Sequence, residues 1–277
     1  MTDKSAREFG PRDWILSSFS LMGVSFDDRI DAAAEAGFAG IGLLLFEYSS
    51  LLESGRTALE LKEALDSRGL VLAEIEALMG WASADTTAAD RALDVACEMA
   101  DVFGARHLQA IGPYEGSIDD AARAFARVCD RAARSELRVA IEFLPPNNIP
   151  DAGVALEIAE RADRPNGGVC LDVWHHFRGA KDESLIRALP CERIVSLQLS
   201  DGTLEPADPN YMADTMENRV APGEGEFDLP GFLAMLDEIG CRAPRSFEVL
   251  SKEYSSMPPV DVARRIAAGA KKLPAPA

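Results

Sequence analysis

Apolar and polar positions follow two alternating patterns along this chain. Short apolar runs typical of buried β-strands recur eight times, at residues 14–21, 40–47, 71–78, 107–112, 138–145, 169–175, 193–201 and 245–251. Most of the intervals between them repeat apolar residues at helical spacing opposite a polar face, as residues 25–36, 86–103, 117–134 and 228–239 do. The pattern predicts a strand followed by a helix, repeated along the chain.

Signals at the helix ends support this division. Ser25 and Ser117 each precede acidic residues, which predicts helix N-caps, and Gly37 and Gly104 stand where helices should stop. Several strands are apolar on both faces, as strands of a parallel sheet are when helices cover it. Eight such units in 277 residues predict a single-domain (β/α)8 TIM barrel over residues 1–277. A doubly wound open sheet is the alternative, although neither GxGxxG nor GxxxxGK[ST] occurs.

Composition and charge exclude several classes of protein. With 47% hydrophobic and 27% charged residues the chain can bury a full core, so it is neither disordered nor fibrous. Its net charge of −18 repels phosphate backbones and anionic lipid surfaces, so we expect no nucleic-acid or membrane partner. The polar opening MTDKSAREFGPRDW lacks the apolar core of a signal peptide, which predicts a cytoplasmic protein. The five cysteines show no CxxC spacing and are expected to be reduced.

One connection is much longer than the others. Residues 202–227 follow the seventh strand and exceed an ordinary strand-to-helix loop, which predicts a lid on the catalytic face of a barrel. Gly223 and Gly225 could form its hinge, and we expect few apolar anchors until a substrate binds. Arg219, within this insert, could contact a substrate oxygen, and a solvated surface arginine is the equal alternative.

Polar residues stand near the carboxyl ends of otherwise apolar strands. Four of them, Glu142, Asp172, Gln198 and Glu248, come from the last four strands and have apolar neighbours on both sides. Because a buried carboxylate is costly unless it is paired or bound to a cation, three acids and an amide in this arrangement predict a divalent metal ion. Oxygen ligands favour Mg²⁺ or Mn²⁺, and nearby His175 leaves Co²⁺ and Zn²⁺ open.

Further polar residues are assigned to other roles. Glu47 and Glu76 end the second and third predicted strands and are candidate substrate contacts. His175, three residues after Asp172, could move a proton or contact the substrate. His176 is expected to form a hydrogen bond in a loop, and His107 to lie in the core at the stability face of a barrel.

These motifs together resemble those of the xylose isomerase-like TIM-barrel superfamily. The likeness rests on Glu142, Asp172-x-x-His175, Gln198-x-x-Asp201, Arg219-x-x-Pro-Gly-x-Gly and Glu248 in this order. The resemblance implies one divalent ion held by Glu142, Asp172, Gln198 and Glu248, with His175 and Arg219 contacting substrate. An amide at Gln198, where many epimerases of the group have histidine, is similar to 3-dehydroshikimate dehydratases. The phrase Asp172-Val-Trp-His departs from that branch. The DNA-repair branch needs more histidines than the three present.

The function implied is a metal-dependent isomerase or epimerase of a sugar or keto-polyol, working through α-proton abstraction and an enediolate. Glu142 and Glu248 are the candidate base and acid. Two alternatives stay open: a dehydratase of a cyclic keto-polyol such as 3-dehydroshikimate or an inosose, and a non-catalytic sugar-binding barrel. The expected partner is a small polyhydroxy ketone or sugar, and homo-oligomerisation is left open.

Overall fold

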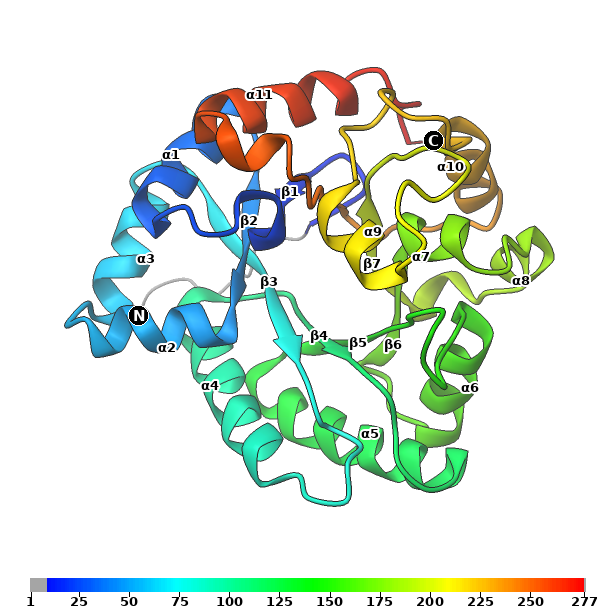
Figure 1. Cartoon of the computed structure of the whole chain (residues 1–277). Coiled ribbons are helices and arrows are strands. Elements are labelled where there is room, and N and C mark those ends of the chain that lie inside the picture. Colours follow the sequence, from blue (N-terminus) through cyan, green and yellow to red (C-terminus); the bar gives the residue numbers. More distant parts are fainter. Residues whose placement is uncertain (1–8, 277) are drawn as a thin grey trace.

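Each of the eight apolar runs contains a strand, and the strands close into a parallel barrel (Figure 1). The computed structural model describes residues 9–276, so Met1 to Glu8 of the polar opening lie outside the described residues. Every strand pairs with its neighbours in sequence, and β1 also pairs with β8, which confirms the barrel and rules out the open sheet. The strands are β1 (Trp14–Leu16), β2 (Gly40–Leu44), β3 (Val71–Leu78), β4 (His107–Ile111), β5 (Arg138–Glu142), β6 (Gly167–Asp172), β7 (Ile194–Leu199) and β8 (Arg245–Phe247).

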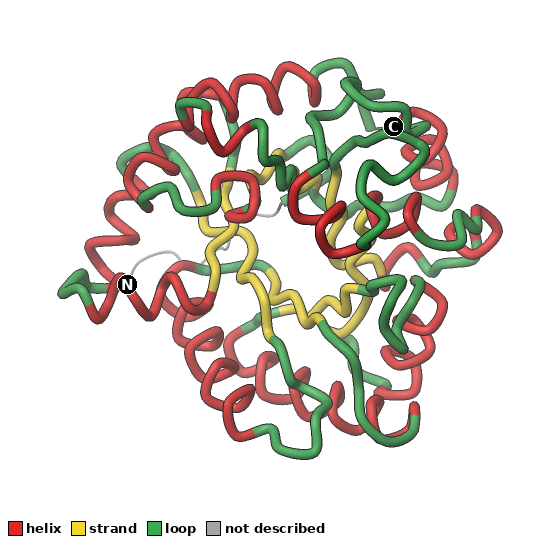
Figure 2. Tube along the Cα trace, viewed as in Figure 1, coloured by secondary structure: helices red, strands yellow, loops and turns green. Residues whose placement is uncertain are grey.

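Helices surround the strands as an outer ring (Figure 2). They are α1 (Phe26–Ala36), α2 (Leu45–Glu53), α3 (Ala58–Asp66), α4 (Thr87–Phe103), α5 (Ile118–Ala132), α6 (Ala152–Ala162), α7 (Val173–Arg178), α8 (Glu183–Arg187), α9 (Tyr211–Glu217), α10 (Leu229–Glu238) and α11 (Pro259–Ala270). Short 3₁₀ turns cover Ser18–Leu21, Ala133–Ser135, Cys191–Arg193 and Tyr254–Ser256.

The predicted helix boundaries are confirmed. The Ser25 hydroxyl accepts a hydrogen bond from the Asp28 amide at 3.2 Å, and Ser117 forms a reciprocal capping box with Asp120. Gly37 and Gly104 end α1 and α4 with left-handed backbone, at φ of 87° and 71°. Local sequence therefore places both ends of these helices.

Several strands end earlier than the apolar runs predict. Residues 18–21 form a 3₁₀ turn, α2 begins at Leu45, α7 begins at Val173, and β8 stops at Phe247. The reason is that an apolar run does not distinguish a buried strand from the buried first turn of a helix. Leu45 and Tyr48 of α2 are buried, as a strand in the wall would be.

The core has an apolar outer layer and a polar interior. One large apolar cluster fills the space between the strands and the helices. Inside the barrel, by contrast, Glu74, His107, Gln109, Ser196 and Ser246 are all buried. Buried polar groups need partners, so this interior requires the hydrogen bonds described below.

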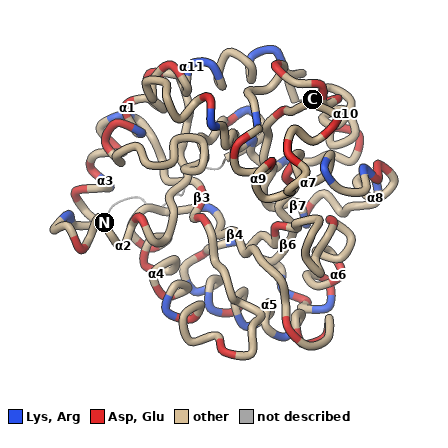
Figure 3. The backbone as a smooth tube through the Cα atoms, in the orientation of Figure 1, with Lys and Arg blue, Asp and Glu red and all other residues tan. Residues whose placement is uncertain are grey.

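The surface and the thiols agree with the composition. Figure 3 shows both signs of charge on the outer helices. All five cysteines are free thiols, as predicted. Within residues 9–276, we find no helix with both the length and the apolarity needed to cross a bilayer.

Candidate active site

Three acids and a histidine meet at the carboxyl end of the barrel. Glu142 is the last residue of β5, Asp172 the last of β6, and Glu248 follows β8 directly; all three are buried. Nε2 of His175, in the first turn of α7, lies 3.2 Å from Glu142 Oε1 and 3.3 Å from Asp172 Oδ2. One ligand atom from each of Glu142, Asp172 and His175 lies within 4.8 Å of the other two.

Local structure fixes the direction of Asp172. Its Oδ1 accepts a hydrogen bond from the Trp174 amide at 2.8 Å, so the side chain caps α7. The other oxygen, Oδ2, faces His175 and Arg219. The strand-to-helix turn therefore presents one carboxylate oxygen to the cluster and holds it there.

Arg219 is the cation of the cluster. Its Nη1 lies 2.9 Å from both Asp172 Oδ2 and Glu248 Oε2, and its guanidinium lies 5.3 Å from the centre of the Trp174 ring. Only 1% of the residue is exposed, so Arg219 is buried and is not the solvated arginine of the alternative interpretation. Its role as a substrate contact stays a prediction.

Gln198 lies beside Glu248. Its Nε2 donates to Glu248 Oε1 at 2.9 Å, and its Oε1 accepts from the thiol of Cys170 at 3.2 Å. The amide is thus in the cluster, but its nitrogen rather than its oxygen faces Glu248. A half-turn of the amide would exchange the two atoms, and its role as a metal ligand stays a prediction.

The charges in this cluster are unbalanced. Burial, reinforced by the charge of Asp172, raises the pKa of Glu142 to about 8, and burial also raises the pKa of Glu248 well above its usual value. Burial lowers the pKa of His175 to about 4, so its imidazole is neutral. Three acids share one guanidinium, and the remaining negative charge needs protons or a further cation. Their oxygen donors fit a divalent ion.

Tyr211 belongs to the cluster, although no pattern in the sequence pointed to it. Its hydroxyl lies 2.5 Å from Nδ1 of His175, and the two rings stack with centroids 6.0 Å apart. If the hydroxyl donates to Nδ1, the imidazole proton is on Nε2 and points at Glu142 and Asp172. Tyr211 comes from α9, inside the long insert, and only the fold brings it to His175.

The insert is firmly anchored, contrary to the expectation of a loosely held lid. Asp201 accepts hydrogen bonds from the amides of Gly202, Gly223 and Phe227 at 2.8 to 3.0 Å. A Cβ on Gly225 would come within 2.3 Å of Asp201, so this glycine permits close packing and is not a free hinge. The Phe227 ring also stacks on Phe177, with centroids 4.5 Å apart.

Glu47 and Glu76, the two other residues predicted to contact the substrate, have partners outside the acid cluster around His175. Glu47 is on α2, not at a strand end, and it pairs with Arg29 at 2.7 Å. Glu76 lies inside β3 and accepts a hydrogen bond from the Ser18 amide at 3.2 Å. Burial, with the charge of Glu74 added, raises the pKa of Glu76 well above its usual value. Their roles toward a substrate stay predictions.

Of the other two histidines, one lies where the sequence predicts and one does not. His107 is fully buried at the start of β4, with Nε2 3.3 Å from Glu74 Oε2, in agreement with a core position. His176 is not in a loop: it lies in α7 and packs against the ring of Phe232, with centroids 5.1 Å apart. The helix begins at Val173, which the apolar run concealed.

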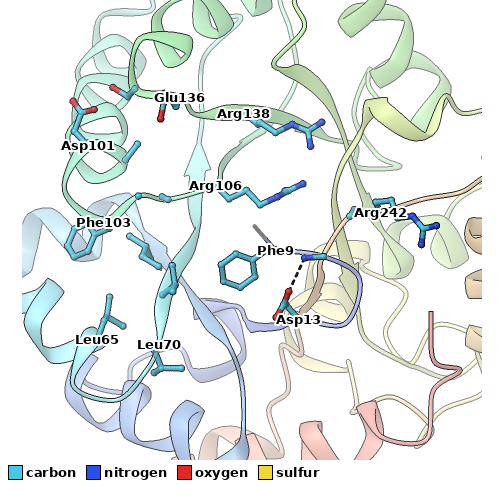
Figure 4. Close-up of a pocket in the computed structure, with 18 of the residues that line it drawn as sticks. Phe9, Asp13, Leu65, Leu70, Asp101, Phe103, Arg106, Glu136, Arg138 and Arg242 are labelled. Carbon is cyan, nitrogen blue, oxygen red and sulfur yellow. Dashed lines mark hydrogen bonds between the residues drawn. The ribbon is translucent and has the colours of Figure 1, made fainter. Parts of the chain in front are cut away.

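A large cavity lies at the opposite end of the barrel (Figure 4). It measures about 1620 Å³, and Phe9, Arg106 and Arg138 help to line it. The two arginines donate to the carbonyls of Val195 and Glu192, at the amino end of β7. Both arginines stand at the amino ends of strands, β4 and β5, whereas the acidic cluster lies at the carboxyl ends, where TIM-barrel enzymes carry their chemistry.

Comparison with known proteins identifies relatives. The family described as xylose isomerase-like TIM barrel matches residues 30–273. A 3-dehydroshikimate dehydratase of Pseudomonas putida is 24% identical over 88% of this chain, and an inosose isomerase of Halalkalibacterium halodurans is 33% identical over 43% of it. The match covers 39% and 41% of these relatives, so the chain spans less than half of their length. A crystal structure of the IOLI protein with a bound zinc atom superposes with a TM-score of 0.83 at 18% identity, covering 93% of this chain and 96% of that one.

Proposed function

Because the chain belongs to the xylose isomerase-like TIM-barrel family, we propose that it is a divalent-metal-dependent isomerase or epimerase of a sugar or keto-polyol. The observation that carries this proposal is the buried cluster of Glu142, Asp172 and Glu248 around His175 and Arg219. Perturbed acids that converge at the catalytic end of a barrel are typical of proton-transfer sites. The dehydratase and the isomerase named above as its relatives are enzymes.

The donor set determines where an ion would be held. Glu142, Asp172, Gln198 and Glu248 are the proposed ligands, and Nε2 of His175 lies beside two of them, Glu142 and Asp172. A bound divalent ion would polarise the substrate carbonyl and so make the adjacent C–H more acidic. The zinc bound by the IOLI protein supports an ion of this kind.

In the proposed reaction, the two glutamates transfer protons from different sides. Glu142 ends β5 and Glu248 follows β8, and these strands are on different sides of the closed barrel. One carboxylate accepts the α-proton and the other returns a proton, to the same carbon in an epimerisation or to its neighbour in an isomerisation. Arg219 binds a substrate oxygen, and the neutral imidazole of His175 donates from Nε2.

A dehydratase is the second candidate. It is supported by the dehydroshikimate dehydratase relative, which aligns with most of this chain. Its first step is the same removal of an α-proton by a glutamate. The proton would then pass from Glu142 through His175 to a leaving β-hydroxyl, which departs as water.

Solvent exchange tests the proposal. Protein loaded with Mn²⁺ and incubated in D₂O with a panel of ketoses and inososes should place deuterium on the α-carbon, as followed by NMR. Exchange with a rearranged ketone supports the isomerase, and exchange followed by an enone supports the dehydratase. Metal binding without exchange of any α-proton would favour the sugar-binding barrel and contradict the proposal.

A further inference from the structure

Basic residues are scarce at the catalytic end of the barrel. The segments that follow the eight strands are residues 17–25, 45–53, 79–86, 112–117, 143–151, 173–182, 200–228 and 248–258. Together they contain sixteen Asp and Glu residues but four Lys and Arg residues, and five of the eight segments have no Lys or Arg. A group that binds an anionic substrate must therefore be sought among very few side chains.

Most of these few cations are already paired. Arg219 is held by Asp172 and Glu248, as described above. Arg178 pairs with Asp214 at 2.7 Å and stacks on the face of Trp174. Lys252 pairs with Glu217 at 3.0 Å, and its side chain is 76% exposed to solvent. Arg29, which reaches the same end from α1, is paired with Glu47.

Lys181 is the remaining basic residue of these segments. It is exposed, and it lies at a small cavity of about 50 Å³ that His175 and Phe143 also line. Lys181 could therefore hold a carboxylate or phosphate of a substrate beside His175, and Lys181→Ala is the variant that tests this possibility.

Exposed apolar side chains also lie at this end of the barrel. Six exposed large hydrophobic side chains lie in the segments that follow β1, β2, β3 and β7: Met22, Phe46, Met79, Leu204, Met212 and Met216. Exposed apolar groups gathered at one end of a molecule mark a binding surface. They can pack against the C–H faces of a ring or chain, but they cannot solvate a charge.

We propose that the substrate is an uncharged polyhydroxy ketone, and not a sugar phosphate or a ketone that carries a carboxylate. This inference rests on the function proposed above. Arg219 is already paired with Asp172 and Glu248, and Arg178 and Lys252 are paired as well, so a further negative group would enter this acid-rich end of the barrel without a free counterion beside the cluster. An uncharged substrate needs hydrogen bonds only, which the carboxylates, Arg219 and His175 can form.

Two pairs of compounds, each with an uncharged and an anionic member, test the proposal. An inosose and 3-dehydroshikimate are both six-membered carbocyclic ketones, and the second carries a carboxylate. Fructose and fructose 6-phosphate differ by the phosphate. Deuterium exchange in D₂O and calorimetric binding are measured for all four compounds with Mn²⁺-loaded wild-type protein and with Lys181→Ala.

We expect binding or exchange to favour an uncharged member over its anionic partner by about 100-fold, with values unchanged in Lys181→Ala. Equal or better use of an anionic member overturns the inference, and a selective loss of that use in Lys181→Ala would identify Lys181 as its receptor. Selective binding of an uncharged member without exchange keeps the inference about charge while contradicting the proposed reaction. Binding of neither uncharged compound overturns the inference.

Discussion

Removing the charge of Arg219 should destabilise the metal-free protein and should be largely reversed by a metal ion. Arg219→Met keeps most of the side-chain volume but leaves Asp172 and Glu248 without the guanidinium that lies 2.9 Å from each. Breaking a buried ion pair by removing one partner costs about 3–5 kcal/mol. Because Glu248 already has a raised pKa and can accept a proton, we expect the lower end, about 3 kcal/mol at pH 8.

The expected shift in melting temperature follows from the size of the protein. The entropy of unfolding is about 2.1 cal/mol/K per residue, so for this chain 3 kcal/mol corresponds to a decrease of about 5 °C. The measurement is thermal unfolding by circular dichroism in EDTA and in excess Mn²⁺. An ion that binds the freed carboxylates stabilises only the folded state, so most of the 5 °C should be recovered with Mn²⁺.

Arg178→Met is the matched control. The side chain of Arg178 is 3% exposed, pairs with the buried Asp214 at 2.7 Å and stacks on Trp174, so its loss should destabilise the fold as well. Mn²⁺ should not recover this loss, because Asp214 is not among the proposed ligands. Two results would refute the electrostatic account of the cluster. One is an unchanged melting temperature of Arg219→Met in EDTA. The other is a lowered melting temperature that persists at saturating Mn²⁺, as it should in Arg178→Met.

Four further predictions concern the metal, the proton transfers and the insert. Asp172→Ala should bind less than one equivalent of metal, by elemental analysis after dialysis, and should lose turnover while keeping its circular dichroism spectrum. His175→Asn should retain the ion and lose about 10² to 10⁴ in kcat; a variant that loses the ion instead makes His175 a ligand. Burial raises the folded-state pKa of Glu142 from 4.5 to about 8. The contribution of its protonated form to the free energy of unfolding is therefore complete below pH 4.5 and is lost as the pH rises through 8. Urea midpoints in EDTA should fall across this range, and excess Mn²⁺ should weaken the trend because the ion favours the ionised carboxylate. Asp201→Ala removes the acceptor for three amides of the insert, so limited proteolysis should cut within residues 202–227 faster than in wild type, and equal rates would show that other contacts hold the insert.

Local features of the chain were sufficient to predict the barrel. Alternating strand and helix patterns depend on which positions are buried, and the caps at Ser25 and Ser117 depend on hydrogen bonds within three residues. The same burial argument selected Glu142, Asp172, Gln198 and Glu248, because a polar residue in an apolar strand near its carboxyl end needs a partner. The fold brings these four residues to one end of the barrel.

The contacts that shape the site could not be predicted from the sequence. Arg219 is 47 residues from Asp172, Tyr211 is 36 from His175, and Arg29 is 18 from Glu47. Each of these pairs depends on where a loop or helix returns over the barrel, and periodicity says nothing about that path. The same limit explains why the sequence does not decide between a surface and a site position for Arg219, whereas Glu47 is misplaced because an apolar run does not distinguish a strand from the first turn of a helix.

The sequence by itself therefore determined the order of the elements, the closed parallel architecture they favour and the acids near the strand ends. Tertiary structure decided which charges meet: the guanidinium between Asp172 and Glu248, the hydroxyl of Tyr211 on His175, and the ion pair that occupies Glu47. The physical reason is the distance along the chain over which each effect acts. Burial periodicity and helix capping act within a few residues, whereas the balance of charge in a buried site depends on groups that only the closed barrel brings within a few ångströms of one another.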